Sequence, residues 1–127
     1  MSCDILLVDD NSIQATTRKA ILARLNRNVV VADNAARALE ILDGQRSDRP
    51  VGLIITDHLM PGMNGPEFVA ELRERLPHVP VLVLSGMADA EDDYQDLEVT
   101  FRVKPLPPDE LLRLVRSLLA GPIARSA

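Results

Sequence analysis

The chain has 127 residues, 46% of them hydrophobic and 26% charged, which predicts one soluble globular domain rather than two domains or a disordered chain. The formal net charge of −5 and the aromatic content of 2% disfavour direct binding to DNA or RNA. No apolar run approaches the roughly 18 residues of a membrane span, and no signal pattern opens the chain, so we expect a cytoplasmic protein that does not enter a membrane. The single cysteine, Cys3, excludes an internal disulfide and a cysteine-based metal cluster.

Five short apolar runs, rich in β-branched residues, are predicted to be strands. They cover residues 4–8, 28–32, 51–57, 80–85 and 99–103. Helical patterns open at Asn11 or Ser12, at Asn34, and at residues 65 and 107, whereas residues 86–98 are ambiguous. This alternation predicts an α/β fold, a doubly wound parallel sheet with helices on both faces. We assign residues 1–120 to this domain and 121–127 to a frayed tail or the start of a linker.

The sequence also predicts which side chains point inward and which face solvent. The inward face of the first helix is expected to carry Ile13, Thr17, Ala20, Ile21 and Leu25. His58 and His78 lie on separate loops without the spacing of metal ligands, and we expect both at the surface.

Chemically active side chains stand at the carboxyl ends of four predicted strands. Asp9 and Asp10 follow the first strand, Asp57 ends the third, Ser85 ends the fourth and Lys104 follows the fifth. Doubly wound sheets bind ligands at this edge, so the five residues are expected to converge. Three carboxylates in a small space require a cation, and an oxygen-only ligand set without cysteine or paired histidine favours Mg²⁺.

These residues fall into motifs that resemble the receiver domain of bacterial two-component response regulators, including single-domain chemotaxis regulators. The motifs are "VDD" at 8–10, "DHLMPGMNG" at 57–65, Ser85 after an apolar strand and "VKP" at 103–105. The resemblance spans nearly the whole chain. It implies a five-stranded flavodoxin-like sheet with the strand order 2-1-3-4-5.

The resemblance also implies a role for each residue of the set. Asp57 would attack a phosphohistidine on a sensor histidine kinase or phosphotransfer protein and become an aspartyl phosphate, from an exposed position at the strand end. Asp10 would bind Mg²⁺ directly and Asp9 mostly through water, with Asp57 and the carbonyl of Leu59 as further ligands. The metal and Lys104 would neutralise the phosphoryl oxygens from two sides.

Two further features of the family concern the switch that follows phosphorylation. Ser85 would move its hydroxyl onto the phosphoryl group, and the ring of Phe101 would turn inward behind it. The Lys104–Pro105 peptide would be cis and aim the ammonium group inward. The implied function is therefore a phosphorylatable signalling switch that controls a downstream partner, rather than an enzyme acting on a separate substrate.

Other interpretations of the same residues were weighed. Asp9 and Asp10 alone fit a helix cap, Lys104 alone a surface charge and Phe101 alone a core residue, but these do not explain a common sheet edge. A haloacid-dehalogenase-type phosphatase would have its two acids as D-x-D after the first strand, whereas here they are adjacent. A flavin or dinucleotide site would want a Gly-, Ser- or Thr-rich first loop. A receiver-like docking module that takes no phosphate remains a third alternative.

The chain departs from the family pattern between Ser85 and Lys104. This segment is shorter than usual, and "DLEV" replaces the usual glycine-containing turn, so the fourth helix should be short or irregular. Its acids are Asp89, Glu91, Asp92, Asp93, Asp96 and Glu98. Because like charges repel across a two-fold axis, we expect a monomer or a weak dimer. Apolar Leu59 and Met87, each two positions after a site residue, predict slow self-dephosphorylation.

Overall fold

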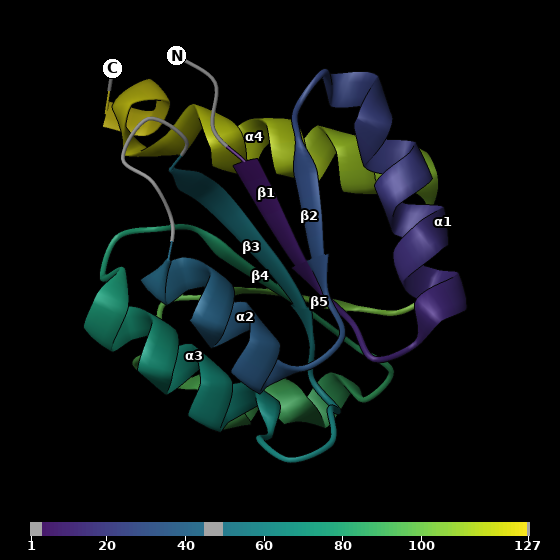
Figure 1. Cartoon of the computed structure of the whole chain (residues 1–127). Helices are drawn as coiled ribbons and strands as arrows, with labels where there is room; N and C mark the ends of the chain where they lie inside the picture. Colours follow the sequence, from purple (N-terminus) through teal and green to yellow (C-terminus); the bar gives the residue numbers. More distant parts are fainter. Residues whose placement is uncertain (1–3, 45–49, 127) are drawn as a thin grey trace.

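The strands of the protein form one parallel sheet. A computed structural model describes residues 4–44 and 50–126, with side chains described through residue 120, so Cys3 lies outside the described residues. The strands β1 (Asp4–Val8), β2 (Val29–Ala32), β3 (Val51–Asp57), β4 (Val81–Ser85) and β5 (Thr100–Val103) are arranged in the order β2-β1-β3-β4-β5 (Figure 1). This topology confirms the predicted fold class.

Helices cover both faces of the sheet. In chain order they are α1 (Ser12–Leu22), the 3₁₀ turn η1 (Ala23–Leu25), α2 (Ala35–Asp43), α3 (Gly65–Arg75), the 3₁₀ helix η2 (Ala88–Tyr94) and α4 (Pro108–Ser126). α2 and α3 lie on one face of the sheet, and α1 and α4 lie on the other (Figure 1). Among the described residues, no helix is both long enough and apolar enough to cross a membrane.

Two hydrophobic clusters follow from the alternation of side chains along β1. Leu6 and Val8 join the cluster beneath α2 and α3, whereas Ile5 and Leu7 join the cluster beneath α1 and α4. All four side chains are fully buried. A strand buried on both faces must be apolar at every position, which explains the unbroken apolar run in the sequence.

Asparagine side chains fix the starts of the helices around the sheet edge. Asn11 accepts hydrogen bonds from the amides of Ile13 and Gln14 at 3.0 Å each, so α1 begins directly after the two acids of the first loop. Asn34 caps α2, as predicted, and Asn64 forms a reciprocal capping box at the start of α3. The loops that carry the site residues are therefore held from their helical ends.

The inward face of α1 was predicted correctly only in part. Ile21 and Leu25 pack against the core cluster as expected, whereas Ile13, Thr17 and Ala20 are exposed. Ile13 is 78% exposed, whereas Ala15 and Leu22 are buried against the sheet. Arg18 lies between these two positions on the same face and is only 16% exposed. The pattern misled because a cationic side chain, rather than an apolar one, occupies the central inward position of the helix.

The last two helical segments also bear on the sequence predictions. The fourth helix is a 3₁₀ helix, as its short sequence predicted, and left-handed residues follow it at Asp96 (φ 67°) and Glu98 (φ 56°). The final helix was expected to end near Leu119, before Gly121 and Pro122, but its backbone stays helical through Ser126.

Candidate functional site

Strand register brings the predicted residues to one edge of the sheet. Val8 pairs with Thr56, so Asp9 and Asp57 leave adjacent strands at the same level. Asp57 pairs with Leu84 and Ser85 pairs with Val103, which sets Ser85 and Lys104 on the next two strands. Parallel pairing alone therefore collects side chains that are far apart in the sequence.

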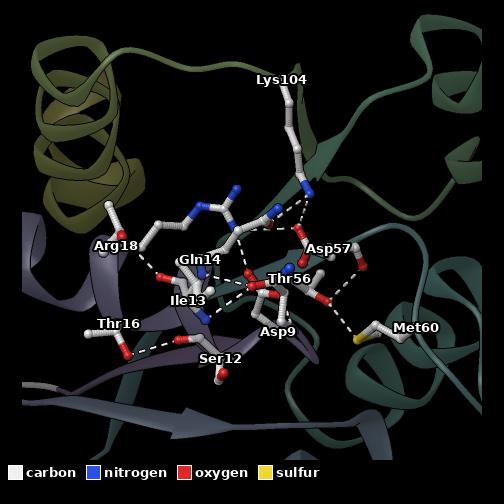
Figure 2. A network of polar contacts seen from close by, with 12 residues as sticks. Asp9, Ser12, Ile13, Gln14, Thr16, Arg18, Thr56, Asp57, Met60 and Lys104 are labelled. Atoms are coloured by element: carbon white, nitrogen blue, oxygen red, sulfur yellow. Dashed lines mark hydrogen bonds and ion pairs between the residues drawn. The ribbon is translucent and has the colours of Figure 1, made fainter.

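Asp57 contacts Lys104 directly. The Nζ atom of Lys104 lies 2.8 Å from Oδ1 of Asp57 (Figure 2). The Lys104–Pro105 peptide is cis, as the family resemblance implied. The side chain of Asp57 is only 5% exposed, so the prediction of an exposed carboxylate was wrong. Two cationic groups, Nζ of Lys104 and Nη1 of Arg18, lie at the Oδ1 atom of this buried carboxylate.

Three carboxylates meet beside this ion pair. Asp9, Asp10 and Asp57 each offer one oxygen, and these oxygens lie within 4.8 Å of one another. Asp9 is buried and Asp10 is exposed. The donor set fits a hard divalent cation such as Mg²⁺, which prefers carboxylate oxygens and keeps several water ligands.

Burial changes the acidity of Asp9. The loss of solvent, the hydrogen bond to Asp57 and the negative charge of Asp57 together raise the pKa of Asp9 to about 7, against the lowering effects of the Asn11 amide and the Arg18 charge. The Asn11 amide donates to Oδ1 of Asp9 at 2.9 Å. The pocket therefore holds an acid that is costly to ionise without a cation.

Two residues of α1 complete the polar network, and neither was predicted from the sequence. Arg18 Nη1 lies 2.7 Å from Oδ2 of Asp9 and 3.4 Å from Oδ1 of Asp57 (Figure 2). One turn earlier, Oε1 of Gln14 accepts a hydrogen bond from Nζ of Lys104 at 3.3 Å. Two polar side chains four residues apart lie on one face of a helix, and a helix that follows an acidic loop can point such a face at the acids. This spacing could have indicated Gln14 and Arg18, but the apolar pattern assigned the inward face to other residues.

The predicted switch residues lie near the site but do not enter it. Oγ of Ser85 accepts a hydrogen bond from the Met87 amide at 2.9 Å and donates to the Met87 carbonyl at 3.3 Å. Phe101 is 7% exposed, and its ring centroid lies 6.0 Å from that of Tyr94. The hydroxyl is thus engaged with its own loop, and the ring is already turned inward.

Leu59 and His78 both lie in loops and are both exposed. Leu59 follows the expected acceptor, and its side chain is 67% exposed. His78 is exposed, as the sequence predicted.

His58 is buried, which corrects the prediction that it faces solvent. It is 7% exposed, and its Nδ1 atom lies 2.7 Å from the Tyr94 hydroxyl, while Nε2 lies 4.0 Å from a carboxylate oxygen of Asp93. Gly65 makes this contact possible, because a Cβ atom there would collide with the Tyr94 hydroxyl. The loop after Asp57 is therefore joined to η2 through a buried polar contact.

Comparison with known proteins assigns this arrangement to a family. Residues 5–116 match the family described as the response regulator receiver domain. The two-component response regulator ORR5 of rice, Oryza sativa subsp. japonica, is 33% identical over 91% of this chain and 87% of its own length. The hydrogenase transcriptional regulatory protein HoxA of Cupriavidus necator is 33% identical over 88% of this chain, which spans only 23% of HoxA.

A solved structure agrees with these sequence matches. The response regulator receiver protein from Pseudomonas putida is 31% identical and superimposes with a TM-score of 0.81, covering 92% of this chain and 98% of that one. The relatives come from plants and bacteria. With the acidic cluster, the lysine and the strand order on one sheet edge, the chain belongs to the receiver-domain family of two-component response regulators.

Proposed function

We propose that this chain takes a phosphoryl group onto Asp57 from a phosphohistidine of a sensor histidine kinase or phosphotransfer protein, in a Mg²⁺-dependent reaction, and then changes conformation to control a downstream partner. The observation that carries the proposal is the position of the Asp57 carboxylate between an acidic cluster and Nζ of Lys104, 2.8 Å away. Phosphoryl transfer needs this kind of positioning and charge neutralisation more than covalent chemistry from other side chains.

The reaction follows from these contacts. An oxygen of Asp57 attacks phosphorus, the P–N bond to the donor imidazole breaks, and the departing imidazole takes up a proton. Lys104 neutralises negative charge on the phosphoryl oxygens. Asp9, Asp10 and Asp57 would hold Mg²⁺, which supplies further neutralisation of those oxygens. Ser85 has to release the backbone of Met87 before its hydroxyl can bond a phosphoryl oxygen.

Labelling with a small phosphodonor tests the assignment. Acetyl phosphate with Mg²⁺ should phosphorylate the wild-type chain once, and chelation of the metal should prevent it. Asp57→Asn should take up no label, whereas Asp89→Asn, an equivalent change at an exposed acid of η2, should label normally. Equal labelling of Asp57→Asn and the wild-type chain would contradict the proposal. A docking module that takes no phosphate would leave both unlabelled.

A groove beside the acceptor suits the docking of the phosphodonor. Ile13, Thr17, Leu106 and Pro108 line it between α1 and the start of α4, and Lys104 borders it. Ile13 is 78% exposed at the edge of this groove, so its side chain is available to a docking partner. Ile13→Asp should slow transfer from a phosphorylated kinase or phosphotransfer partner while leaving labelling by acetyl phosphate unchanged.

The acidic segment restricts self-association in the proposed activated state. The acids of residues 89–98 are all exposed, and the nearest basic residues expected to offset them are Arg102, Arg113 and Arg116 on β5 and α4. Pairing two such surfaces about a two-fold axis brings like charges together. Sedimentation should find a monomer or weak dimer when Asp57 carries beryllium fluoride. A tight dimer that Arg113→Glu abolishes would contradict this expectation.

A further inference from the structure

Arg18 reaches the acidic pocket from a direction that neither the metal ligands nor Lys104 uses. It projects from the inward face of α1, between the buried positions Ala15 and Leu22, and its side chain is only 16% exposed. Its Nη1 atom contacts Oδ2 of Asp9 at 2.7 Å and approaches Oδ1 of Asp57 at 3.4 Å. Figure 2 shows the guanidinium beside these carboxylates, on the α1 side of the pocket.

Arg18 contacts two of the three carboxylates that would hold the proposed metal. Asp9 and Asp57 belong to the set of three carboxylates whose oxygens lie within 4.8 Å of one another. A guanidinium at hydrogen-bond distance from a carboxylate oxygen excludes a metal ion from that same lone pair. Its unit charge also repels a divalent cation nearby, and at about 4 Å this repulsion lowers affinity roughly thirtyfold even in a medium with the dielectric constant of water.

Lys104 does not compete in the same way. It contacts Asp57 and Gln14, and its contacts among the described residues do not include Asp9. Arg18 is therefore the cation that bridges the proposed acceptor and the buried acid. Asp9 lies at the floor of the pocket with a side chain that is 0% exposed, so it needs a positive partner whenever it is ionised.

We propose that Arg18 is a resident counter-cation of the acidic pocket, which Mg²⁺ must displace from Asp9 in order to bind, so that Arg18 sets the metal affinity of the site. Arg18 is thus a positioning residue rather than a metal ligand. This inference rests on the proposed function only in taking Mg²⁺ as the metal. It gives α1 a regulatory part, because any partner that draws Arg18 outward would favour metal binding.

Calorimetric titration with Mg²⁺ at pH 8 tests the inference without reference to phosphorylation. Arg18→Gln should bind Mg²⁺ roughly thirtyfold more tightly than the wild-type chain. Arg18→Lys, which keeps the charge, should stay closer to the wild-type affinity. Arg24→Gln removes the same charge from an exposed position on η1 and should leave the affinity unchanged. Unchanged or weaker binding by Arg18→Gln, or an equal gain in Arg24→Gln, would overturn the inference.

A second measurement covers the case in which Arg18→Gln is poorly folded without metal. The free energy of unfolding in urea should be lower for Arg18→Gln than for the wild-type chain in chelator, and Mg²⁺ should raise it at lower concentrations in the variant. Mg²⁺ could stabilise the wild-type chain and Arg18→Gln over the same range of Mg²⁺ concentration. That result would refute the role of Arg18 while leaving the metal site in place. If Mg²⁺ stabilises neither chain, the metal-dependent function itself fails, and the proposal for Arg18 with it.

Discussion

Replacement of Arg73 by methionine is predicted to lower the free energy of unfolding by about 3 kcal/mol. Arg73 lies in the last turn of α3, and its guanidinium donates to four backbone carbonyls. The acceptors are Val79 at 2.7 Å, Leu97 at 2.8 Å, Glu98 at 2.8 Å and Leu76 at 3.2 Å. These carbonyls belong to the loops that lead into β4 and β5, so one side chain holds both loops against α3.

The magnitude follows from the exposure of these contacts. Three of the bonds are partly buried and the bond to Glu98 is exposed. At about 1 kcal/mol net for each partly buried bond, and less for the exposed one, the total is about 3 kcal/mol. This is a large share of the roughly 5–15 kcal/mol that stabilises a typical domain. The methionine keeps most of the alkyl packing, so the loss reports mainly on the hydrogen bonds.

Urea unfolding of matched variants provides the assay. Arg75, two residues later on the same helix, makes exposed ion pairs with Asp43 and Glu71, and Arg75→Met should have little effect. Arg73→Lys should lose most of the stability that Arg73→Met loses, because a single ammonium cannot span both loops. Equal midpoints for Arg73→Met and Arg75→Met, with unchanged slopes, would refute the reasoning.

Three other predictions concern the surroundings of the site. Gly65→Ala should destabilise the fold by about 1–3 kcal/mol, because its Cβ would meet the Tyr94 hydroxyl; adding Tyr94→Phe should recover part of the loss, and strictly additive losses in urea unfolding would contradict this contact. Without metal, the pKa of Asp9 is about 7 in the folded chain and about 3.8 in the unfolded chain, so the folded chain holds this proton more tightly. The resulting stability is fully present below pH 3.8 and is lost as the pH rises through about 7. The free energy of unfolding measured in chelator should therefore fall as the pH rises across this range, and Asp9→Asn should remove most of that fall. An unchanged pH dependence in Asp9→Asn would show that another group causes it. Met87→Glu or Leu59→Asn should speed loss of phosphate from Asp57, since a polar group there can orient water, and unchanged lifetimes in both would remove this explanation.

Much of the site could be predicted because parallel strands convert sequence position into spatial position. Asp9, Asp57, Ser85 and Lys104 each stand at the end of a strand, and any register that buries the apolar runs brings these ends together. The strand order came from the family resemblance rather than from periodicity. Short-range turn chemistry was equally readable, since Asn34 caps its helix as expected.

The residues that escaped prediction depend on the phase of a helix or on contacts between distant segments. An apolar pattern that began at Ile13 placed the first turns of α1 in the wrong orientation, and this concealed Arg18. His58 was expected at the surface because its partner, Tyr94, lies in a segment whose structure the sequence left ambiguous. A buried polar pair can be predicted from the sequence only when the positions of both residues in the fold are already known.

Formal charge links the proposed role of Arg18 to the reaction itself. Before metal binding, and at a pH above the raised pKa of Asp9, three carboxylates face two cationic side chains, so the pocket carries one net negative charge. Binding of Mg²⁺ reverses that sign, which explains why Arg18 should oppose it. Phosphorylation then converts the Asp57 carboxylate into a mixed anhydride bearing roughly two negative charges, and the site becomes neutral only if Arg18 is counted. The same guanidinium therefore weakens metal binding before transfer and balances the phosphoryl group after it. Arg18→Gln should consequently bind Mg²⁺ more tightly and yet hold its phosphoryl group less well, a pair of opposite effects that a merely structural role for Arg18 would not produce.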